Sequence, residues 1–337
     1  MRTVRVWFNH WFSTAYNIIC MIKEDEDVDF VTVGSNTDEN CVYRAVCDEW
    51  FTEAAFDDSA EYVDFCVAFC REHEIDVFVP RRNMREVSRR LSEFDAIGVK
   101  VLVERNCRIT SAFSDKAETY RLFGESEIGH IPPYCIVNSV AEYEEAYRRL
   151  KTEDNRVCLK FASDEGAVSF RVVDDRIGYN LTENVGAKMT HASVIKMLSR
   201  LKKFPALLVM PYLSGTEVSV DCLSMRDGEH IIIPRYKSWG RSETIKFDPD
   251  IMNICSSFLD KFGLRCPCNL QFKYEGDVPY FLEVNARMSG GIQLSYAATG
   301  VNIPNIAVNR LLGIEKRQVW DKTTRVVSFI ETSVLLR

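Results

Sequence analysis

The stretch at 269–291, NLQFKYEGDVPYFLEVNARMSGG, decides the fold class and carries most of the chemistry. Two runs that mix apolar and polar residues in alternation flank Gly276-Asp277, a pair that is typical of a hairpin turn. The arrangement predicts two antiparallel strands joined by a tight turn. In the second strand, Leu282 and Val284 are expected to turn toward the apolar side of the sheet.

The other face of this hairpin collects polar side chains. Gln271 and Glu283 are equally distant from the turn, so they should lie opposite each other with Cβ atoms about 4.5–5.5 Å apart. Because strand side chains alternate, Asn285 and Arg287 share that face. Oxygen donors suit Mg²⁺, and a guanidinium beside them can stabilise a transferring phosphoryl group. From spacing alone, a surface hairpin with solvated polar residues is the alternative.

Residues 1–105 predict an open parallel α/β domain. Short apolar, β-branched runs have the composition of buried parallel strands at 4–8, 29–33, 75–80 and 99–104. Between two of them, Asp58 is a capping residue for a helix with an apolar stripe from Tyr62 to Cys70. Strand–helix alternation indicates the α/β class. The first turn, NHWFSTA, lacks GxGxxG, which disfavours a nicotinamide enzyme.

The rest of the chain predicts a mixed α+β architecture in two segments, 106–205 and 206–337. A helix that Ser114-Asp115-Lys116 can cap is expected to end at Gly124. Further helices are expected at 139–151 and 190–203, and strands at 157–161 and 169–173. Three later runs, ALLVMPYL, EVSVDCLS and HIIIPRYK, are expected to form an antiparallel sheet.

Composition restricts the class of protein. Of 337 residues, 46% are hydrophobic and 27% charged, and the net charge of −7 argues against a nucleic-acid surface. No apolar run approaches the roughly 18–20 residues that span a bilayer, and the start does not resemble a signal peptide. The twelve cysteines lie mostly in apolar patterns, and the five histidines show no metal spacing. We therefore expect reduced thiols and a cytoplasmic protein that binds no membrane.

The hairpin resembles the metal-binding signature of the ATP-grasp superfamily, particularly of enzymes similar to carbamoyl phosphate synthase and biotin carboxylase. The resemblance implies an ATP-grasp fold that follows an open parallel α/β (pre-ATP-grasp) domain. It implies that Gln271, Glu283 and Asn285 are the metal-ligand positions and that Arg287 is the catalytic arginine. Gln271 stands where many members have Glu, which removes one negative charge, although Gln also occurs there in the carbamoyl phosphate synthase branch.

The same resemblance, which covers roughly 110–312, implies a set of nucleotide-binding residues. Lys116 and Lys160 correspond to the two nucleotide lysines of the family. Backbone groups of Met210 and Leu213 are the implied adenine contacts. Glu217 corresponds to the acidic residue that holds the ribose hydroxyls.

Two positions depart from the family pattern. The loop at 162–168 is normally glycine-rich, so that backbone N–H groups can approach phosphate. Here it contains Gly166 beside Asp164 and Glu165, and an acidic pair repels phosphate unless it points outward. Pro211 occupies a hinge position where the family usually has Glu, and proline lacks an N–H, so its neighbours must supply the adenine contacts.

Substrate residues are expected after and beside the hairpin. Ser289-Gly290-Gly291 directly follows its second strand, and small residues let backbone amides approach a substrate carboxylate. The run PRYK adds Arg235 and Lys237, which we expect in the substrate pocket. The alternative for these two cations is a solvated strand end.

By this resemblance the chain is an ATP-dependent carboxylate–amine ligase of the amino-acid type. It would act through an acyl phosphate, which an amine attacks, and release ADP and phosphate. A carbamoyl phosphate synthase-like or other ATP-grasp phosphotransferase is one alternative, and a non-catalytic ATP sensor is another. The implied cofactors are ATP and Mg²⁺ or Mn²⁺. The implied partners are small-molecule carboxylate and amine substrates, with a homodimer left open.

Overall fold

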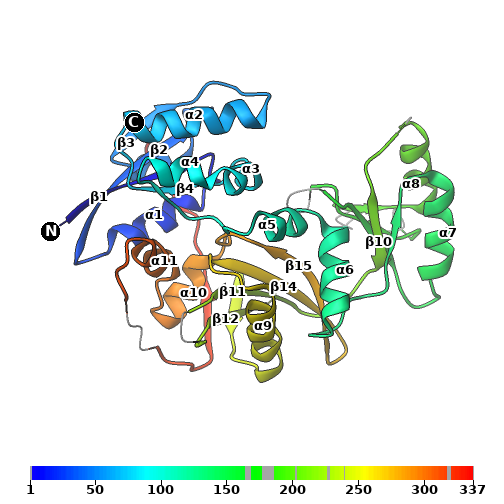
Figure 1. Cartoon of the computed structure of the whole chain (residues 1–337). Coiled ribbons are helices and arrows are strands. Elements are labelled where there is room, and N and C mark those ends of the chain that lie inside the picture. The colour runs from blue at the N-terminus through cyan, green and yellow to red at the C-terminus, as the bar shows by residue number, and fades with distance from the viewer. Residues whose placement is uncertain are drawn as a thin grey trace. The chain divides into compact units, whose positions relative to one another are not determined.

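The computed structural model describes residues 2–163, 168–176, 186–201, 203–225, 228–238, 240–316 and 320–336. The chain forms two compact units, each considered by itself (Figure 1). Unit 1 comprises residues 1–111, 218–271 and 284–337, and unit 2 comprises residues 112–217 and 272–283. The division into three segments at residues 105 and 205 stays a prediction.

The N-terminal part of unit 1 is a five-stranded parallel sheet with the order β3-β2-β1-β4-β5. Its strands are β1 (Arg2–Asn9), β2 (Val28–Asn36), β3 (Glu49–Thr52), β4 (Val77–Val79) and β5 (Lys100–Val101). The helices of this region are α1 (Ala15–Lys23), the 3₁₀ helix η1 (Val42–Val46), α2 (Ser59–Glu72), α3 (Met84–Arg89), α4 (Leu91–Ala96) and α5 (Cys107–Phe113). The predicted open α/β domain is confirmed.

The central strand β1 is buried on both faces. Val6 and Phe8 belong to one apolar cluster, and Trp7 belongs to another, where its ring stacks on Phe69 (4.3 Å between centroids) and Phe78 (4.2 Å). Burial on both faces explains the consecutive apolar residues Val6, Trp7 and Phe8. The sequence did not predict β3, whose four residues are half-buried or exposed and lack a strand pattern.

The second sheet has six strands in the order β15-β14-β11-β12-β13-β16. Their bounds are β11 (Glu217–Leu223), β12 (Ile231–Lys237), β13 (Ser242–Ile245), β14 (Cys268–Glu275), β15 (Val278–Asn285) and β16 (Arg325–Ser328). Helices α9 (Pro249–Phe262), α10 (Ile292–Thr299) and α11 (Ile303–Leu311) complete unit 1. The predicted hairpin is confirmed as β14–β15, with Gly276 at a positive φ of 59° in its turn.

Polar contacts join the N-terminal sheet to the helices that follow the hairpin. The Asp25 carboxylate, just after α1, accepts hydrogen bonds from Asn305 (2.8 Å) and Asn309 (2.7 Å) of α11 and pairs with Lys316 (3.1 Å). Burial alone would raise the pKa of Asp25, but hydrogen bonds from Asn305, the Asp27 N–H, Lys316 and Asn309 lower it to about 2. These contacts connect the C-terminal end of α1 to α11.

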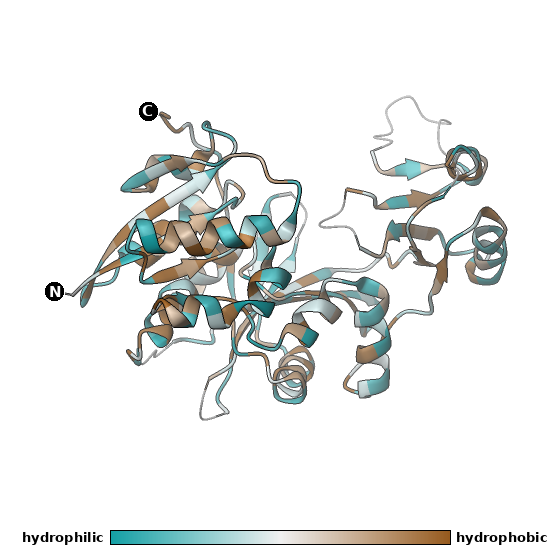
Figure 2. Cartoon of the chain, turned by 45° about the horizontal axis from the view of Figure 1, so that its top comes forward, coloured by the Kyte–Doolittle hydropathy of each residue, from teal (hydrophilic) through white to brown (hydrophobic). Residues whose placement is uncertain are grey.

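Unit 2 is built on a five-stranded sheet with the order β6-β10-β7-β8-β9. The strands are β6 (Cys135–Val137), β7 (Val157–Phe161), β8 (Arg171–Val173), β9 (Lys188–Met189) and β10 (Leu207–Pro211). The helices are α6 (Lys116–Ser126), α7 (Val140–Leu150) and α8 (His191–Ser199). Most strands of this sheet carry hydrophobic residues, and the helices carry both hydrophilic and hydrophobic residues (Figure 2).

Two predictions about this region are wrong. The run ALLVMPYL does not join the sheet of β11 and β12, because β10 pairs antiparallel with β6 and β7. Local alternation identifies a strand but not its neighbours. Helix α6 does not end at Gly124 but continues to Ser126. A Cβ at Gly124 would lie 2.9 Å from the Ile131 side chain, so close packing explains this glycine.

The expected thiol chemistry is confirmed, since all twelve cysteines are free. Among the described residues, no helix combines the length and the apolar character that crossing a membrane requires.

Candidate active site

A buried lysine and a carboxylate form the centre of the candidate nucleotide site in unit 2. Lys160 lies on β7 and is 9% exposed, and its Nζ is 3.6 Å from Oε2 of Glu283 on β15. Burial lowers the pKa of Lys160, Glu283 offsets this in part, and the charge of Lys116 lowers it further. Two predicted nucleotide residues and one predicted metal ligand are therefore close enough to interact electrostatically.

The two faces of the unit 2 sheet differ, as the alternation of VCLKF predicts. Val157 and Leu159 pack with α7 and α8 on one face. Cys158 and Leu208, which pairs in register with Lys160, belong to the cluster on the other face. That cluster also contains Tyr120, Val172 and Met210, with Tyr212 and Leu282 at its edge. Lys160 thus projects on a face that offers an apolar surface for a flat ring.

Lys116 is held in place by the start of α6. The Asp115 carboxylate caps this helix and accepts from the N–H groups of Ala117 (2.8 Å) and Glu118 (3.1 Å). The Lys116 N–H donates to the carbonyl of Ala162 (2.9 Å), just after β7. This backbone hydrogen bond therefore connects the start of α6, where Lys116 lies, to the end of β7, the strand that carries Lys160.

The linker after β10 is fixed to the hairpin. The Gly215 N–H donates to the Tyr274 carbonyl (3.1 Å), and the Tyr274 N–H donates to Thr216 (3.0 Å). A Cβ at Gly215 would lie 2.4 Å from that Tyr274 oxygen, so only glycine permits the approach. The predicted adenine residues flank this point, with both Met210 and Leu213 buried.

Glu217 and the loop at 162–168 are the other predicted nucleotide-binding positions of unit 2. Glu217 is the half-buried first residue of β11. In the loop at 162–168, Asp164, Glu165 and Gly166 lie outside the described residues, so the conformation of the acidic phosphate loop stays open.

The remaining hairpin residues belong to unit 1. Arg287 donates from Nη2 to Oδ1 of Asn285 (3.1 Å) and from Nη1 to the carbonyl of Met288 (3.0 Å). Its guanidinium carbon lies 5.4 Å from the ring centroid of Phe12. Gln271 donates from Nε2 to Asn269 (3.3 Å). The direct opposition of Gln271 and Glu283 stays a prediction.

The metal-ligand set stays a prediction as well. Across the described part of the chain, no group of three or more His, Cys, Asp or Glu side chains could hold a metal ion. The predicted set contains one carboxylate, Glu283, and two amides, Gln271 and Asn285. Such a set fits Mg²⁺ when phosphate oxygens supply further ligands.

Arg235 is not a solvated strand end. It is 3% exposed, and its guanidinium donates to Asp221 (3.0 Å), to Glu243, to Ser219 (3.1 Å) and to Ser289 (3.1 Å). Burial would lower the pKa of Arg235, but the charges of Asp221 and Glu243 outweigh it and raise the pKa. By contrast, Lys237 is exposed at the end of β12.

The predicted substrate segment lies against Arg235. A Cβ at Gly291 would be 2.5 Å from Nη1 of Arg235, so glycine is required for the backbone to pack on the guanidinium. Gly290 instead approaches the N-terminal domain, since a Cβ there would be 3.7 Å from Thr14 and 3.8 Å from Phe12. Ser289, which precedes both glycines in the chain, is also buried.

Sequence reasoning missed most members of this polar network. Asp221 accepts from Arg235, from Asn269 (3.0 Å) and from Ser295 (2.6 Å), and Glu243 is the second acidic partner of Arg235. One signal was available, because Asp221 lies beside the apolar residues Val220 and Cys222 in the predicted strand EVSVDCLS. A charge in such a strand is costly unless it is paired.

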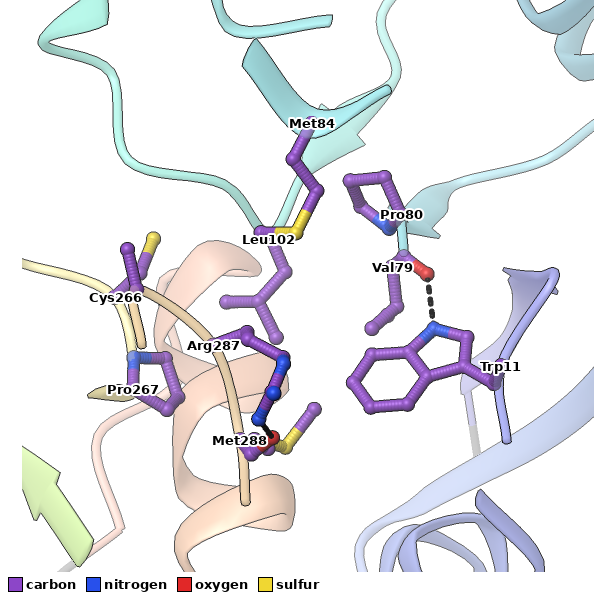
Figure 3. A pocket seen from close by; sticks show the side chains of 10 residues that line it. Trp11, Val79, Pro80, Met84, Leu102, Cys266, Pro267, Arg287 and Met288 are labelled. Carbon is purple, nitrogen blue, oxygen red and sulfur yellow. Dashed lines mark hydrogen bonds between the residues drawn. The ribbon is translucent and has the colours of Figure 1, made fainter. Parts of the chain in front are cut away.

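A small pocket in unit 1 lies beside Arg287 (Figure 3). Its lining comes from Trp11, Val79-Pro80, Met84, Leu102, Cys266-Pro267 and Ala286–Met288. Its enclosed room is about that of one water molecule. The Trp11 Nε1–H donates to the Val79 carbonyl (2.9 Å), which fixes the indole in the wall. Sequence reasoning did not predict this pocket.

Comparisons with known proteins support the predicted resemblance. A sequence model of the family described as "ATP-grasp in the biosynthetic pathway with Ter operon" matches residues 203–332. The carbamoyl phosphate synthase large chain of Clostridium acetobutylicum is 26% identical over an alignment of 193 positions, and the match covers 52% of this chain and 17% of that protein. The predicted resemblance to ATP-grasp proteins is confirmed.

Solved ATP-grasp structures match almost the whole chain. N5-carboxyaminoimidazole synthetase from Staphylococcus aureus, complexed with ADP, has a TM-score of 0.72 at 9% identity and covers 97% of this chain and 82% of its own. Biotin carboxylase from Campylobacter jejuni has a TM-score of 0.69 at 15% identity, covering 93% and 72%. L-amino acid ligase from Bacillus licheniformis has a TM-score of 0.64 at 13% identity, covering 92% and 75%. At these identities the likeness shows the ATP-grasp fold alone.

Proposed function

We propose that the chain is an ATP-dependent carboxylate–amine ligase that forms a C–N bond through an acyl phosphate and releases ADP and phosphate. The observation that carries the proposal is the pair of Lys160 and Glu283, 3.6 Å apart beside an apolar surface in unit 2. An ammonium and a carboxylate in that arrangement complement a phosphate that carries a divalent cation. The S. aureus synthetase complexed with ADP shows that this fold accepts an adenine nucleotide.

The proposed nucleotide contacts follow from this pair. Lys160 and Lys116 would bind phosphate oxygens, and the backbone at Met210 and Leu213 would bind the adenine edge. Glu217 would accept from the ribose hydroxyls. Backbone hydrogen bonds hold Lys116 and the linker near Leu213 in place. This favours catalysis, because preorganised groups need no rearrangement when charge develops.

Glu283, with Gln271 and Asn285, would hold Mg²⁺, with Mn²⁺ as an alternative. The ion, when bound, neutralises charge that develops on the transferring phosphoryl group. Arg287 would stabilise the acyl phosphate and the tetrahedral state that follows attack by the amine.

The geometry changes the proposed role of Arg235. Its charge is balanced by Asp221 and Glu243, so we assign it to positioning of Ser289 and Gly291 instead of direct substrate binding. Lys237 and Gly290 remain proposed substrate contacts. A homodimer and a cytoplasmic location also remain part of the proposal; one ATP-grasp neighbour, a biotin carboxylase domain from Hydrogenobacter thermophilus, is described as a dimer.

The test is ADP and phosphate release from Mg-ATP over a panel of carboxylates and amino acids, each with and without amine. The expected result is release that needs both a carboxylate and an amine. Glu283→Gln should lower the rate about 10²–10³-fold, because it removes the carboxylate that holds the cation. Glu125→Gln, on an exposed position of α6 in the same unit, should leave the rate unchanged and is the matched control.

Activity that survives Glu283→Gln would overturn the metal assignment. Release that needs bicarbonate but no amine would instead support a carbamoyl phosphate synthase-like phosphotransferase, which the 26% identity to that large chain favours as the second candidate. ATP binding without turnover on any member of the panel would identify a sensor.

A further inference from the structure

His10 occupies a constrained position directly after the central strand β1 of unit 1. Its backbone has a positive φ of 47°, a left-handed conformation that residues other than glycine rarely adopt. The His10 N–H donates to the Ser35 carbonyl (3.0 Å), which holds the backbone in this conformation. Strain of this kind is often found at functional positions.

A buried carboxylate holds the His10 imidazole. Its Nε2 lies 2.7 Å from Oε2 of Glu53, whose side chain is 0% exposed, whereas the His10 side chain is 16% exposed. Glu53 also accepts hydrogen bonds from the hydroxyl groups of Ser35 (2.5 Å) and Tyr62 (3.0 Å). The imidazole is therefore fixed from its buried side.

The donors of this network determine the direction of its hydrogen bonds. The Trp7 indole N–H can only donate, and it donates to Ser35 (2.7 Å), so the Ser35 hydroxyl in turn donates to Glu53. The Asn9 amide donates in the same way to the Tyr62 hydroxyl (2.8 Å). Because Glu53 acts as the acceptor throughout, the proton that it shares with the imidazole belongs to Nε2.

The second ring nitrogen, Nδ1, is then the acceptor of the neutral imidazole. Among the described residues, no group forms a hydrogen bond with Nδ1 of His10. An imidazole with one nitrogen held by a buried carboxylate and the other directed elsewhere has the arrangement of a general base.

The loop that begins at His10 contacts the proposed catalytic residues of unit 1. The Phe12 ring centroid is 5.4 Å from the guanidinium carbon of Arg287, and a Cβ at Gly290 would be 3.7 Å from Thr14. The strand order of the parallel sheet reverses between β1 and β4, and ligands of open α/β sheets bind outside the carboxyl ends of the strands at such a point. His10 is thus connected by a short loop to the proposed reaction centre.

We propose that His10 is the general base of the ligation step and that Glu53 is its positioning residue. The proposal rests on the ligase function and adds the class of nucleophile, an alkyl amine that is protonated near neutral pH. Nδ1 takes one proton from the ammonium group, and the nitrogen lone pair attacks the carbonyl carbon of the acyl phosphate. The bond from that carbon to the phosphate oxygen breaks, and phosphate leaves with the electron pair. Phosphate accepts the second proton of the nitrogen, and the imidazolium releases its proton to solvent.

The test compares two nucleophiles, each with Mg-ATP and the carboxylate that gives the fastest ADP release in the panel. The amino acid that the panel selects is mostly protonated near neutral pH and needs a base. Hydroxylamine is mostly neutral and converts an acyl phosphate to a hydroxamate without one. His10→Asn suits the left-handed backbone, which asparagine adopts more readily than most residues. It should lower kcat for amide formation at least about 10²-fold and leave hydroxamate formation within about twofold of the wild type.

Two further variants separate catalysis from structure. Glu53→Gln places an amide donor opposite Nε2, which favours the tautomer with its proton on Nδ1, so amide formation should fall at least about tenfold with hydroxamate formation retained. The matched control is His230→Asn, since His230 forms another histidine–carboxylate pair of unit 1, with Asp260 (2.9 Å). The control should leave both rates unchanged.

A pH series supplies a second readout. The titratable and charged groups that face the imidazole are Glu53, Tyr62 on α2 and Arg82, whose Nη1 lies 3.3 Å from Nε2. Arg82 stays charged at alkaline pH, and burial raises the pKa of Tyr62, so neither changes its charge there. Raising the pH should therefore restore amide formation by His10→Asn, because the amine loses its proton without a base, and should affect the wild type less.

The outcomes distinguish this role from the ligase function. Equal loss of amide and hydroxamate formation in His10→Asn would make the residue structural, and wild-type rates of both would remove it from catalysis; either overturns the proposal. If the wild type forms amide but no hydroxamate, restoration of His10→Asn by high pH supports the base, and a loss that persists at every pH overturns it. If the wild type forms neither product, the ligase function fails and the role of His10 fails with it.

Discussion

Two buried cations, Lys160 in unit 2 and Arg235 in unit 1, meet their carboxylates in different ways. Lys160 lies 3.6 Å from Glu283, and the net effect of its surroundings is to lower its pKa, with burial as the largest cause. Arg235 donates directly to Asp221 and Glu243, and although burial opposes it, the net effect is to raise its pKa. The surroundings of Lys160 disfavour its charged form, whereas the surroundings of Arg235 favour its charged form.

The difference separates a binding role from a structural one. At Lys160, burial disfavours the charged form more than Glu283 favours it. Such a buried charge is typical of a group that binds a ligand, here an anion. At Arg235, Asp221 and Glu243 outweigh the cost of burial, so this cation already has its counterions. Perturbation should therefore reduce activity at Lys160 and stability at Arg235.

The largest expected effect is on stability at Arg235. Arg235→Met removes the cation and leaves Asp221 and Glu243 buried without it, at 2% and 12% side-chain exposure. Breaking a buried pair in this way costs about 3–5 kcal/mol. Urea unfolding followed by circular dichroism should show a lower midpoint with an unchanged slope.

The control for this change is Arg241→Met. Arg241 pairs with Glu331 at 2.6 Å, but its side chain is 54% exposed. Solvent-exposed pairs contribute about 0–1 kcal/mol, so this variant should unfold close to the wild type. Equal destabilisation by both substitutions would mean that the network around Arg235 is not what stabilises unit 1.

The next effect is on activity at Lys160. Lys160→Met removes the charge proposed to bind phosphate and should lower ADP release about 10²–10³-fold. The free energy of unfolding should stay within about 1 kcal/mol, because methionine fills similar space without the cost of a buried ammonium. Parallel rate and urea measurements check both statements.

Lys196→Met supplies the matched control on the exposed surface of α8 in the same unit. It should change neither rate nor stability. A Lys160 variant that is several kcal/mol less stable, with activity per folded molecule intact, would reverse the comparison and make Lys160 the structural residue.

Sequence reasoning predicted the site of Lys160 and missed most of the network around Arg235. Lys160 was predicted because the resemblance to ATP-grasp enzymes assigns it to the nucleotide site, and strand alternation decides which face its side chain occupies. The hairpin was predicted because its turn and both strands are contiguous. These features need no knowledge of distant parts of the chain.

The network around Arg235 depends on tertiary neighbours. Asp221 meets Ser295, which is 74 residues away, and Asn269, which is 48 residues away. The alternation along β11 predicts which face of the strand Asp221 occupies. It does not predict that β12 and β14 bring partners to that face. The same limit explains the misplaced strand β10 and the unpredicted pocket, whose walls come from six separate stretches between Trp11 and Met288.

The smallest expected effect is a pH dependence that only the lysine site should show. The depressed pKa of Lys160 means that its ammonium loses its proton below the ordinary lysine value of 10.5. Bound phosphate favours the charged form, so ATP affinity should fall several-fold as pH rises from 7 toward 10. For folding the sign is opposite: in that window the unfolded chain holds more protons at this group, so its contribution to stability rises with pH.

Lys160→Arg separates this group from the other titrating residues, because a guanidinium keeps its charge throughout the range. Titration calorimetry of ATP at several pH values should give a flatter affinity profile for Lys160→Arg than for the wild type, even if its affinity at pH 7 is lower. Arg235 stays charged over the same range and should contribute no slope. Parallel profiles for the two proteins would show that Lys160 keeps its proton near pH 10 and would remove the electrostatic basis for distinguishing it from Arg235.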